Sequence, residues 1–276
     1  MLFMHNIIPI LTGGHVVCQL DSVYLKRTVV LDVFCPPHLL QADSINLLVL
    51  NDGQDAEALN LEETLEALHG SQKIEPVLVV AVHSSAARLQ EYGVAGIPDF
   101  KGRGAMAGDY TSFIIKELMP FLEEAVGRAI TGTRAIAGCS MGGLTAFDIA
   151  WNNGGFFDVA GVFSGAFWWR KKDLNDGYTD DDRIMHQVIR ESKSAAKLKF
   201  WLMAGTEDEK ADRNNNFIID SIDDTIDIIK ELMRKGYNRP QDVYYYEMVG
   251  GQHNTASWSK AFPAFLSWTF GRKMFL

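Results

Sequence analysis

The segment 134–147, RAIAGCSMGGLTAF, constrains the fold more than any other part of this 276-residue chain. Its apolar start is typical of a short buried strand, and the residues after Ser140 are typical of a helix. Gly138 and Gly142 stand two residues before and two residues after Ser140, as in the G-x-S-x-G pattern of a sharp strand-to-helix turn. Larger side chains at these two positions would strike the adjoining strand and helix. The pattern therefore predicts that Ser140 is exposed at the tip of a turn, as a candidate nucleophile.

The same turn offers a way to stabilise negative charge. The backbone N–H of Met141 begins the predicted helix, where the helix dipole favours an anion. It would point towards the oxygen that becomes negative when a serine attacks a carbonyl group. The backbone N–H of Gln54, in the turn after the first inner strand, is the best placed second donor. We therefore predict an oxyanion hole formed by Gln54 and Met141.

Strand-like and helix-like segments alternate along the rest of the chain. Segments 16–20 and 28–35 carry β-branched residues and end in turns, which predicts an opening antiparallel pair. Further strands are predicted at 45–50, 77–82, 134–138, 158–163, 198–204 and 243–249. Helices are predicted at 60–70, 110–122, 141–151, 221–235 and 258–269. Such alternation predicts an α/β fold, with a mainly parallel twisted sheet and helices on both faces.

Two local signals refine the helix predictions. Asn60 and Glu63 have the spacing of a capping box at the start of the first helix. Pro120 predicts a kink or a restart in the helix at 110–122.

Composition and charge limit the class of protein. No repeat, low-complexity segment or linker divides the sequence, so we expect a single domain over residues 1–276. A net charge of −9 without a basic stripe argues against nucleic acid or an anionic membrane as a partner. The apolar N-terminus lacks a basic start, and Pro9 interrupts it too early for a signal peptide or a membrane span. We expect a cytoplasmic protein, and the sequence does not indicate its oligomeric state.

The cysteines do not form a recognisable framework. Cys18, Cys35 and Cys139 are too few and too scattered for a set of disulfides or a zinc site. Buried thiols are expected, with a Cys18–Cys35 bridge as the alternative.

A serine nucleophile needs a base, and the base needs a carboxylate that holds its tautomer. His253 is the candidate base, because it follows the last predicted strand and comes after the serine in the chain. His83 is the rival by position but precedes the serine. Among the acids that follow strand 198–204, Asp208 is preferred, since a short side chain there can turn back towards the histidine, and Glu207 is the second candidate. No HExxH or GxGxxG pattern accompanies these residues, so no cofactor is required.

The segment 212–223, DRNNNFIIDSID, has the spacing of a calcium loop. Its oxygen-bearing side chains and one carbonyl group belong to Asp212, Asn214, Asn216, Ile218, Asp220 and Asp223. Phe217 replaces the usual glycine, and an aspartate replaces the bidentate glutamate. The alternative is a solvated loop in which Asp220 caps the following helix. A structural Ca²⁺ is therefore a hypothesis for this loop.

Seven segments in order resemble the putative-esterase family of α/β-hydrolases, which includes esterase D, enterochelin esterases, feruloyl esterases and mycolyltransferases. The resemblance runs from about Leu47 to Gly271, and the enterochelin-esterase branch is nearest. It rests on LLVLNDGQD at 47–55, RLQEY at 88–92, GRGAMAGDYTSFIIKELMPFLEE at 102–124, AGCSMGGLTAF at 137–147, FSGAFWW at 163–169, AGTED at 204–208 and GGQHNTASWSKAFPAFLSW at 250–268. It implies an α/β-hydrolase fold with Ser140 as nucleophile, His253 as base and Asp208 as acid. The oxyanion donors it implies are the backbone N–H groups of Gln54 and Met141.

The resemblance also implies a small-molecule ester substrate and an acyl-enzyme. Acyl transfer to another alcohol would use the same residues, and a non-catalytic binding protein is the alternative class. Phe167, Trp168 and Trp169 would either stack an aryl group or pack in the core. Arg88 would either hold a substrate carboxylate or pair with Glu91, and we prefer the pairing.

Overall fold

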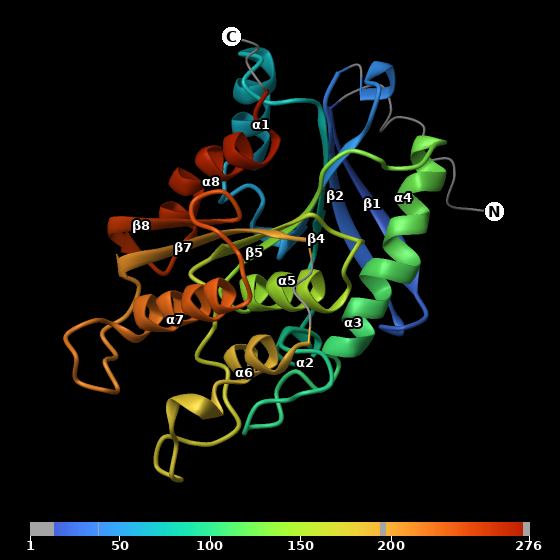
Figure 1. Cartoon of the computed structure of the whole chain (residues 1–276). Coiled ribbons are helices and arrows are strands. Elements are labelled where there is room, and N and C mark those ends of the chain that lie inside the picture. The colour runs from blue at the N-terminus through green and yellow to red at the C-terminus, as the bar shows by residue number, and fades with distance from the viewer. Residues whose placement is uncertain (1–13, 38, 194–196, 273–276) are drawn as a thin grey trace.

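In the computed structural model, which describes residues 14–37, 39–193 and 197–272, eight strands form one sheet in the order β1-β2-β4-β3-β5-β6-β7-β8 (Figure 1). The strands are β1 Gly14–Ser22, β2 Arg27–Cys35, β3 Asn46–Asn51, β4 Val77–Val82, β5 Arg134–Cys139, β6 Val159–Phe163, β7 Lys199–Glu207 and β8 Val243–Gln252. β2 is antiparallel to both β1 and β4, and the other neighbouring pairs are parallel. The predicted opening pair and the mainly parallel sheet are therefore confirmed.

Helices cover both faces of this sheet, as the alternation predicted (Figure 1). They are α1 Leu61–Gly70, α2 Arg88–Glu91, α3 Ala107–Phe113, α4 Met119–Val126, α5 Met141–Asn152, α6 Ile184–Glu191, α7 Asp220–Arg234 and α8 Thr255–Phe270. On one face α1 and α8 pack against the side of β3 that carries Leu48 and Leu50. On the other face, the core cluster that contains Leu47 and Val49 includes residues of α3 to α7. Successive residues of a strand point to opposite faces, so a strand buried on both faces is apolar throughout.

The predicted capping box at the start of α1 is wrong. Asn60 has a left-handed backbone (φ 50°, ψ 40°), and its side chain makes no capping hydrogen bond. A capping asparagine normally has an extended backbone, from which its side chain reaches the first N–H groups of the helix. The preceding turn supplies an acceptor in place of the Asn60 side chain, because the N–H of Leu61 donates to the carbonyl of Ala56 at 3.0 Å.

The kink predicted at Pro120 takes the form of a π-helical turn. This turn, Ile114–Leu118, joins α3 to α4. Proline cannot donate a hydrogen bond to the carbonyl group four residues earlier, and its ring crowds that carbonyl. A wider turn before the proline lets one long helical segment continue past it.

The three cysteines are buried thiols and do not form disulfides, as expected. In the described ranges, no helix is long and apolar enough to cross a membrane. The cytoplasmic location and the extent of the domain over residues 1–276 stay predictions.

Candidate active site

Ser140 lies in a strained turn between β5 and α5. Its backbone has φ 55° and ψ −121°, a conformation that residues with side chains rarely adopt. The end of β6 holds it there: its N–H donates to the carbonyl of Phe163 at 2.9 Å, and its carbonyl accepts the N–H of Ala166 at 3.0 Å. A Cβ atom on Gly138 would lie 2.5 Å from backbone atoms of Gly142, so only glycine fits. The predicted turn is present, and Ser140 is partly exposed at its tip.

The neighbouring Cys139 does not compete with this serine. It is buried, and burial raises the pKa of its thiol well above the usual value, with a further contribution from the charge of Asp52. A thiol that stays protonated is a weak nucleophile. The chemistry of the turn therefore falls to the hydroxyl group of Ser140.

The two predicted oxyanion donors lie after neighbouring strands. Gln54 is in the short 3-10 helix Gly53–Asp55 that follows β3, and Met141 is the first residue of α5. β3 and β5 are paired in parallel, with Leu50 opposite Ala137, so both turns lie at the same edge of the sheet. In the described part of the chain, the backbone N–H groups of Gln54 and Met141 donate no hydrogen bond. Both are free to bind an oxygen atom at the site.

Buried polar side chains fix the turn after β3 against α5. Asn51 donates from Nδ2 to the carbonyl of Gly142 at 2.8 Å and accepts from the hydroxyl of Tyr110 at 2.7 Å. Asp52 has a left-handed backbone (φ 63°), and its N–H donates to the hydroxyl of Tyr92 at 3.1 Å. The sequence indicated a turn here but not these partners, which lie 40 to 91 residues away.

The expected pairing of Arg88 with Glu91 is wrong. Arg88 binds Asp52 in a bidentate pair, with Nε to Oδ1 at 2.7 Å and Nη2 to Oδ2 at 2.8 Å. Glu91 is buried and is bound in the same way by Arg27 of β2, at 2.8 and 2.7 Å. Two bidentate pairs stabilise more than one exposed pair within a short helix would. Arg88 also lies close enough to His253 for its charge to lower the pKa of that side chain.

His253 lies in the turn between β8 and α8. The turn is held by Asn254, whose Oδ1 accepts the N–H of Ser257 at 2.9 Å and so caps α8. His253 is exposed, but the surrounding protein removes part of the water around its ring, and this desolvation is the main cause of its lowered pKa; the negative charge of Asp208 acts in the opposite direction. Within residues 14–37, 39–193 and 197–272, no hydrogen bond joins His253 to Ser140 or Asp208. Asp208 therefore acts on the imidazole here through its charge.

Asp208 and Glu207, the two candidate acids, have different surroundings. Asp208 is buried, its Oδ2 accepts the N–H of Gly205 at 3.0 Å, and its Oδ1 has no hydrogen-bond partner in the described chain. Glu207 is the exposed last residue of β7 and accepts from Nε2 of Gln252 at 3.3 Å. A buried carboxylate oxygen without a donor is costly and calls for an explanation.

His83, the rival base, is bound to another carboxylate. Its Nε2 contacts Oδ2 of Asp32 on β2, and Nε2 of His15 on β1 lies 2.5 Å from Oδ1 of the same side chain. These three residues line a cavity of about 920 Å³ that also borders Gly53 and Gln54. The Nε2 atom of His83 is therefore already engaged.

The aromatic residues 167–169 contribute mainly to the core. Phe167 and Trp169 are buried, whereas Trp168 is partly exposed. The guanidinium of Arg103 lies 5.0 Å from the ring centroid of Trp168. Of the three residues that could stack an aryl group, only Trp168 is accessible, and Arg103 already lies against its ring.

Four residues of the predicted calcium loop come together in the structure. Oδ2 of Asp223 accepts from Nδ2 of Asn214 at 3.1 Å and of Asn216 at 2.6 Å. The carboxylate of Asp212 accepts the N–H groups of Asn216 at 3.1 Å and Phe217 at 2.9 Å. Among the residues that the structure describes, no group of three or more His, Cys, Asp or Glu side chains is arranged to hold a metal ion. Calcium binding here stays a hypothesis.

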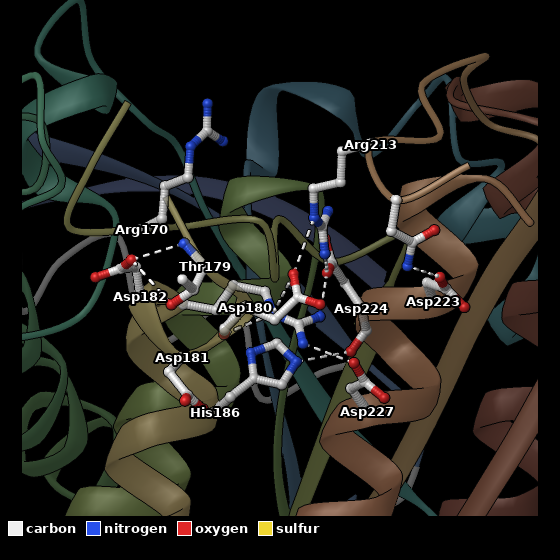
Figure 2. A network of polar contacts seen from close by, with 12 residues as sticks. Arg170, Thr179, Asp180, Asp181, Asp182, His186, Arg213, Asp223, Asp224 and Asp227 are labelled. Atoms are coloured by element: carbon white, nitrogen blue, oxygen red, sulfur yellow. Dashed lines mark hydrogen bonds and ion pairs between the residues drawn. The ribbon is translucent and has the colours of Figure 1, made fainter. Parts of the chain in front are cut away.

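Asp220 does not join those four residues. Its Oδ1 accepts the backbone N–H of Arg213 at 2.9 Å. The Arg213 guanidinium also binds Asp224 of α7 and, at 3.3 Å, Asp180 ahead of α6 (Figure 2). Arg183, which is buried, completes this network by binding the buried Asp224 at 2.5 Å. The loop that follows Asp208 is thereby tied to the segment before α6.

The sheet order, the serine turn after β5, the acid loop after β7 and the histidine after β8 together define an α/β-hydrolase. The chain belongs to the putative esterase family, whose model matches residues 22–269. The match begins earlier in the chain than the motifs from Leu47 onward indicated. No curated protein sequence matches the chain.

Solved esterase structures match the chain over nearly its whole length. The enterobactin esterase of Shigella flexneri, in the presence of enterobactin, has 18% identity and a TM-score of 0.71, over 93% of this chain and 58% of that chain. A ferulic acid esterase has 16% identity and a TM-score of 0.68, over 94% and 98% of the two chains. An IroE-like serine hydrolase from Shewanella oneidensis has 18% identity and a TM-score of 0.68, over 93% and 80%. Identities this low establish a shared fold, and this chain spans little more than half of the enterobactin esterase.

Proposed function

We propose that this chain is a serine carboxylic-ester hydrolase that acts through an acyl-enzyme. The observation that carries the proposal is the position of Ser140, held at positive φ at the start of α5 beside two backbone N–H groups without acceptors in the described chain. A partly exposed hydroxyl next to such donors is suited to attack on a carbonyl group. Membership of the esterase family supports an ester as the substrate class.

In the proposed reaction His253 takes the proton of Ser140 as Oγ forms a bond to the ester carbonyl carbon. The carbonyl oxygen becomes negative and accepts hydrogen bonds from the N–H groups of Gln54 and Met141. The bond to the leaving alcohol then breaks, and His253 gives the alcohol its proton. Water, deprotonated by His253, then attacks the acyl carbonyl carbon. As the resulting tetrahedral intermediate collapses, the bond from that carbon to Oγ of Ser140 breaks, His253 returns the proton to Oγ, and the acid is released.

The role of Asp208 is supported by its unpaired oxygen. In the described chain Oδ1 is buried without a donor, and the charge of the same carboxylate raises the pKa of His253, against the desolvation that lowers it. An imidazole N–H is a donor that would satisfy this oxygen and hold the ring in the tautomer that a base requires. A lowered pKa keeps the imidazole neutral, and thus able to accept a proton, at neutral pH. Glu207 is the alternative acid.

Ser140→Ala tests the proposal. It removes a small hydroxyl, so the protein should stay folded while kcat for ester hydrolysis falls by about 10³-fold or more. Fluorophosphonate labelling with mass mapping should modify Ser140 in the wild type, and Ser259→Ala, which changes a serine of α8, should leave labelling and kcat unchanged. The panel should include short acyl, feruloyl and catechol-lactone esters, each with and without an acceptor alcohol, since transfer to the alcohol would identify an acyltransferase. A wild type that neither reacts with the probe nor cleaves any ester would support a non-catalytic binding protein instead.

A further inference from the structure

The indole ring of Trp258 packs edge-on against the imidazole of His253. The two ring centroids are 5.1 Å apart, and the ring planes meet at 81°. Trp258 lies on the first turns of α8, is only 8% exposed and belongs to the core cluster that contains Cys139 and Phe163. Side chains in a close-packed core cannot turn freely. One side of the space around His253 is therefore bounded by a fixed aromatic surface.

Ser164 fixes the orientation of this indole ring. Nε1 of Trp258 donates to Oγ of Ser164 at 2.9 Å, and both residues are buried. Ser164 directly follows β6 and has a left-handed backbone, with φ 48°. Leaving a buried indole N–H without an acceptor is unfavourable, so this hydrogen bond resists rotation of the ring. Non-glycine residues with positive φ persist only where their surroundings enforce that conformation, and they gather at functional sites.

The turn that contains Ser164 also holds Ser140. The N–H of Ser140 donates to Phe163, and the carbonyl of Ser140 accepts from Ala166, at 2.9 and 3.0 Å. Residues 163–166 thus contact the nucleophile through its backbone. Through Trp258, Ser164 of this segment also acts on the imidazole that follows β8. One short segment at the end of β6 therefore bears on both groups.

We propose that Ser164 and Trp258 are positioning residues that hold the imidazole of His253 in the orientation from which it takes the proton of Ser140. This inference rests on the proposed function, in which His253 is the base. Neither residue contacts the reacting atoms. His253 follows a glycine-rich strand end and has no hydrogen bond to Ser140 or Asp208 in the described chain, so packing against Trp258 restrains its ring.

Displacement of a catalytic group by about 1 Å can slow a reaction by about 100-fold. Trp258→Ala should therefore lower kcat by about 100-fold with little change in KM, because substrate binding does not use the indole. Trp258→Phe keeps an aromatic ring but removes the N–H, and Ser164→Ala removes its acceptor. Each of these milder changes should lower kcat by about tenfold.

The double variant Ser164→Ala/Trp258→Phe shows whether the two residues act as one unit. Since both changes break the same hydrogen bond, the double variant should lose no more activity than either single variant. Trp268→Phe is the matched control, because Trp268 lies on the same helix and is partly buried against the same core cluster. Its ring packs against Tyr244, with the two ring centroids 6.1 Å apart. Its kcat should stay within about twofold of wild type.

The titration of His253 separates positioning from a general loss of packing. Partial desolvation of the ring lowers the pKa of His253, the charge of Asp208 raises it and the charge of Arg88 lowers it further. His253 is already exposed, and Trp258→Ala would open to water the remaining side of the ring that the indole covers, so this pKa should rise towards its ordinary value. The acidic limb of the kcat/KM profile should then move to higher pH, whereas Trp268→Phe should leave it in place. An NMR titration of the His253 ring, assigned by the loss of its signal in His253→Asn, should show the same shift without any substrate.

Wild-type kcat and an unchanged His253 titration in folded Trp258→Phe and Ser164→Ala would overturn the positioning role. Losses that add up in the double variant would overturn the link between the two residues. Thermal unfolding of every variant shows whether the protein is folded, and the rate of fluorophosphonate labelling of Ser140 should fall together with kcat, because this reaction also needs His253 as base. A wild type without ester hydrolysis or labelling would refute the proposed function itself, which is a different result from active Trp258 variants.

Discussion

At the scale of single residues, several side chains at the site stand on backbone conformations that only their neighbours make acceptable. Asp52, Ser140 and Ser164 all have positive φ, at 63°, 55° and 48°. Such conformations cost of order 1–3 kcal/mol each. The cost is offset by the hydrogen bonds of Asn51, Tyr92 and Trp258 that surround these residues. The stability of the site is thus shared among several strands and helices.

Asp208 should matter far more than Glu207. Asp208→Asn should lower kcat for ester hydrolysis by about 10⁴-fold, because an amide in place of the carboxylate favours the wrong tautomer of His253. Glu207→Gln should change kcat by less than about threefold, since Glu207 is exposed and lies at the end of β7. Steady-state kinetics of the two variants give the comparison. The reverse ranking would assign the acid to Glu207.

At the scale of elements, the joint between β5 and α5 is a part of the fold with very little room. A Cβ atom on Gly138 would lie 2.5 Å from the backbone of Gly142, so Gly138→Ala should lower the free energy of unfolding by about 3 kcal/mol. A Cβ atom on Gly108 in α3 would meet no other atom within 4 Å, so Gly108→Ala should stabilise the protein by about 0.5–1 kcal/mol. Urea unfolding of both variants measures the difference. Equal effects would mean that the joint relaxes freely.

Calcium binding by the loop before α7 is a proposal that a titration decides. An ion bound by Asp212, Asn214, Asn216 and Asp223 with a Kd near about 10⁻⁴ M should raise the Tm by about 2–3 °C at millimolar calcium. Asp223→Asn should abolish the response, whereas Asp176→Asn, an exposed acid outside the loop, should retain it. Because the loop follows Asp208, removal of calcium should also lower kcat. Identical Tm values in calcium and in excess EGTA, with no heat of binding, would reject the ion.

At the scale of the whole molecule, α5 runs through the middle of the fold and carries a buried acid. Asp148 accepts the N–H of Ala95 at 2.9 Å and Nδ2 of Asn152 at 2.7 Å. Burial nevertheless raises its pKa to about 7, from 3.8. At pH values between these two pKa values, Asp148 therefore keeps its proton in the folded state and has lost it in the unfolded state. The contribution of Asp148 to stability is greatest below the lower pKa and is lost as the pH rises through the higher one.

Asp148→Asn should remove this pH dependence. The difference in unfolding free energy, variant minus wild type, should become more positive from about pH 5 to about pH 7, by at most about 1.4 kcal/mol per pH unit. The difference in Tm should change in the same direction. Any loss of a hydrogen bond in the variant adds a constant offset, because it does not involve a proton. Thermal unfolding at several pH values separates the two effects. A constant difference across this range would show that Asp148 has the same pKa in both states.

From the sequence alone, the alternation of apolar runs was enough to predict the strands, the mainly parallel sheet and the helices other than α2 and α6, and glycine spacing was enough to predict the turn at Ser140. These features depend on residues close together in the chain, whose periodicity and steric limits can be read directly. The placement of Gln54 and Met141 after neighbouring strands also followed from that pattern. The tertiary structure decided the partners instead: Arg88 binds Asp52 and not Glu91, Asn60 leaves its helix uncapped, and Trp258 meets His253. A side chain chooses its partner from all groups that the fold brings within reach, and most of those are distant in the sequence.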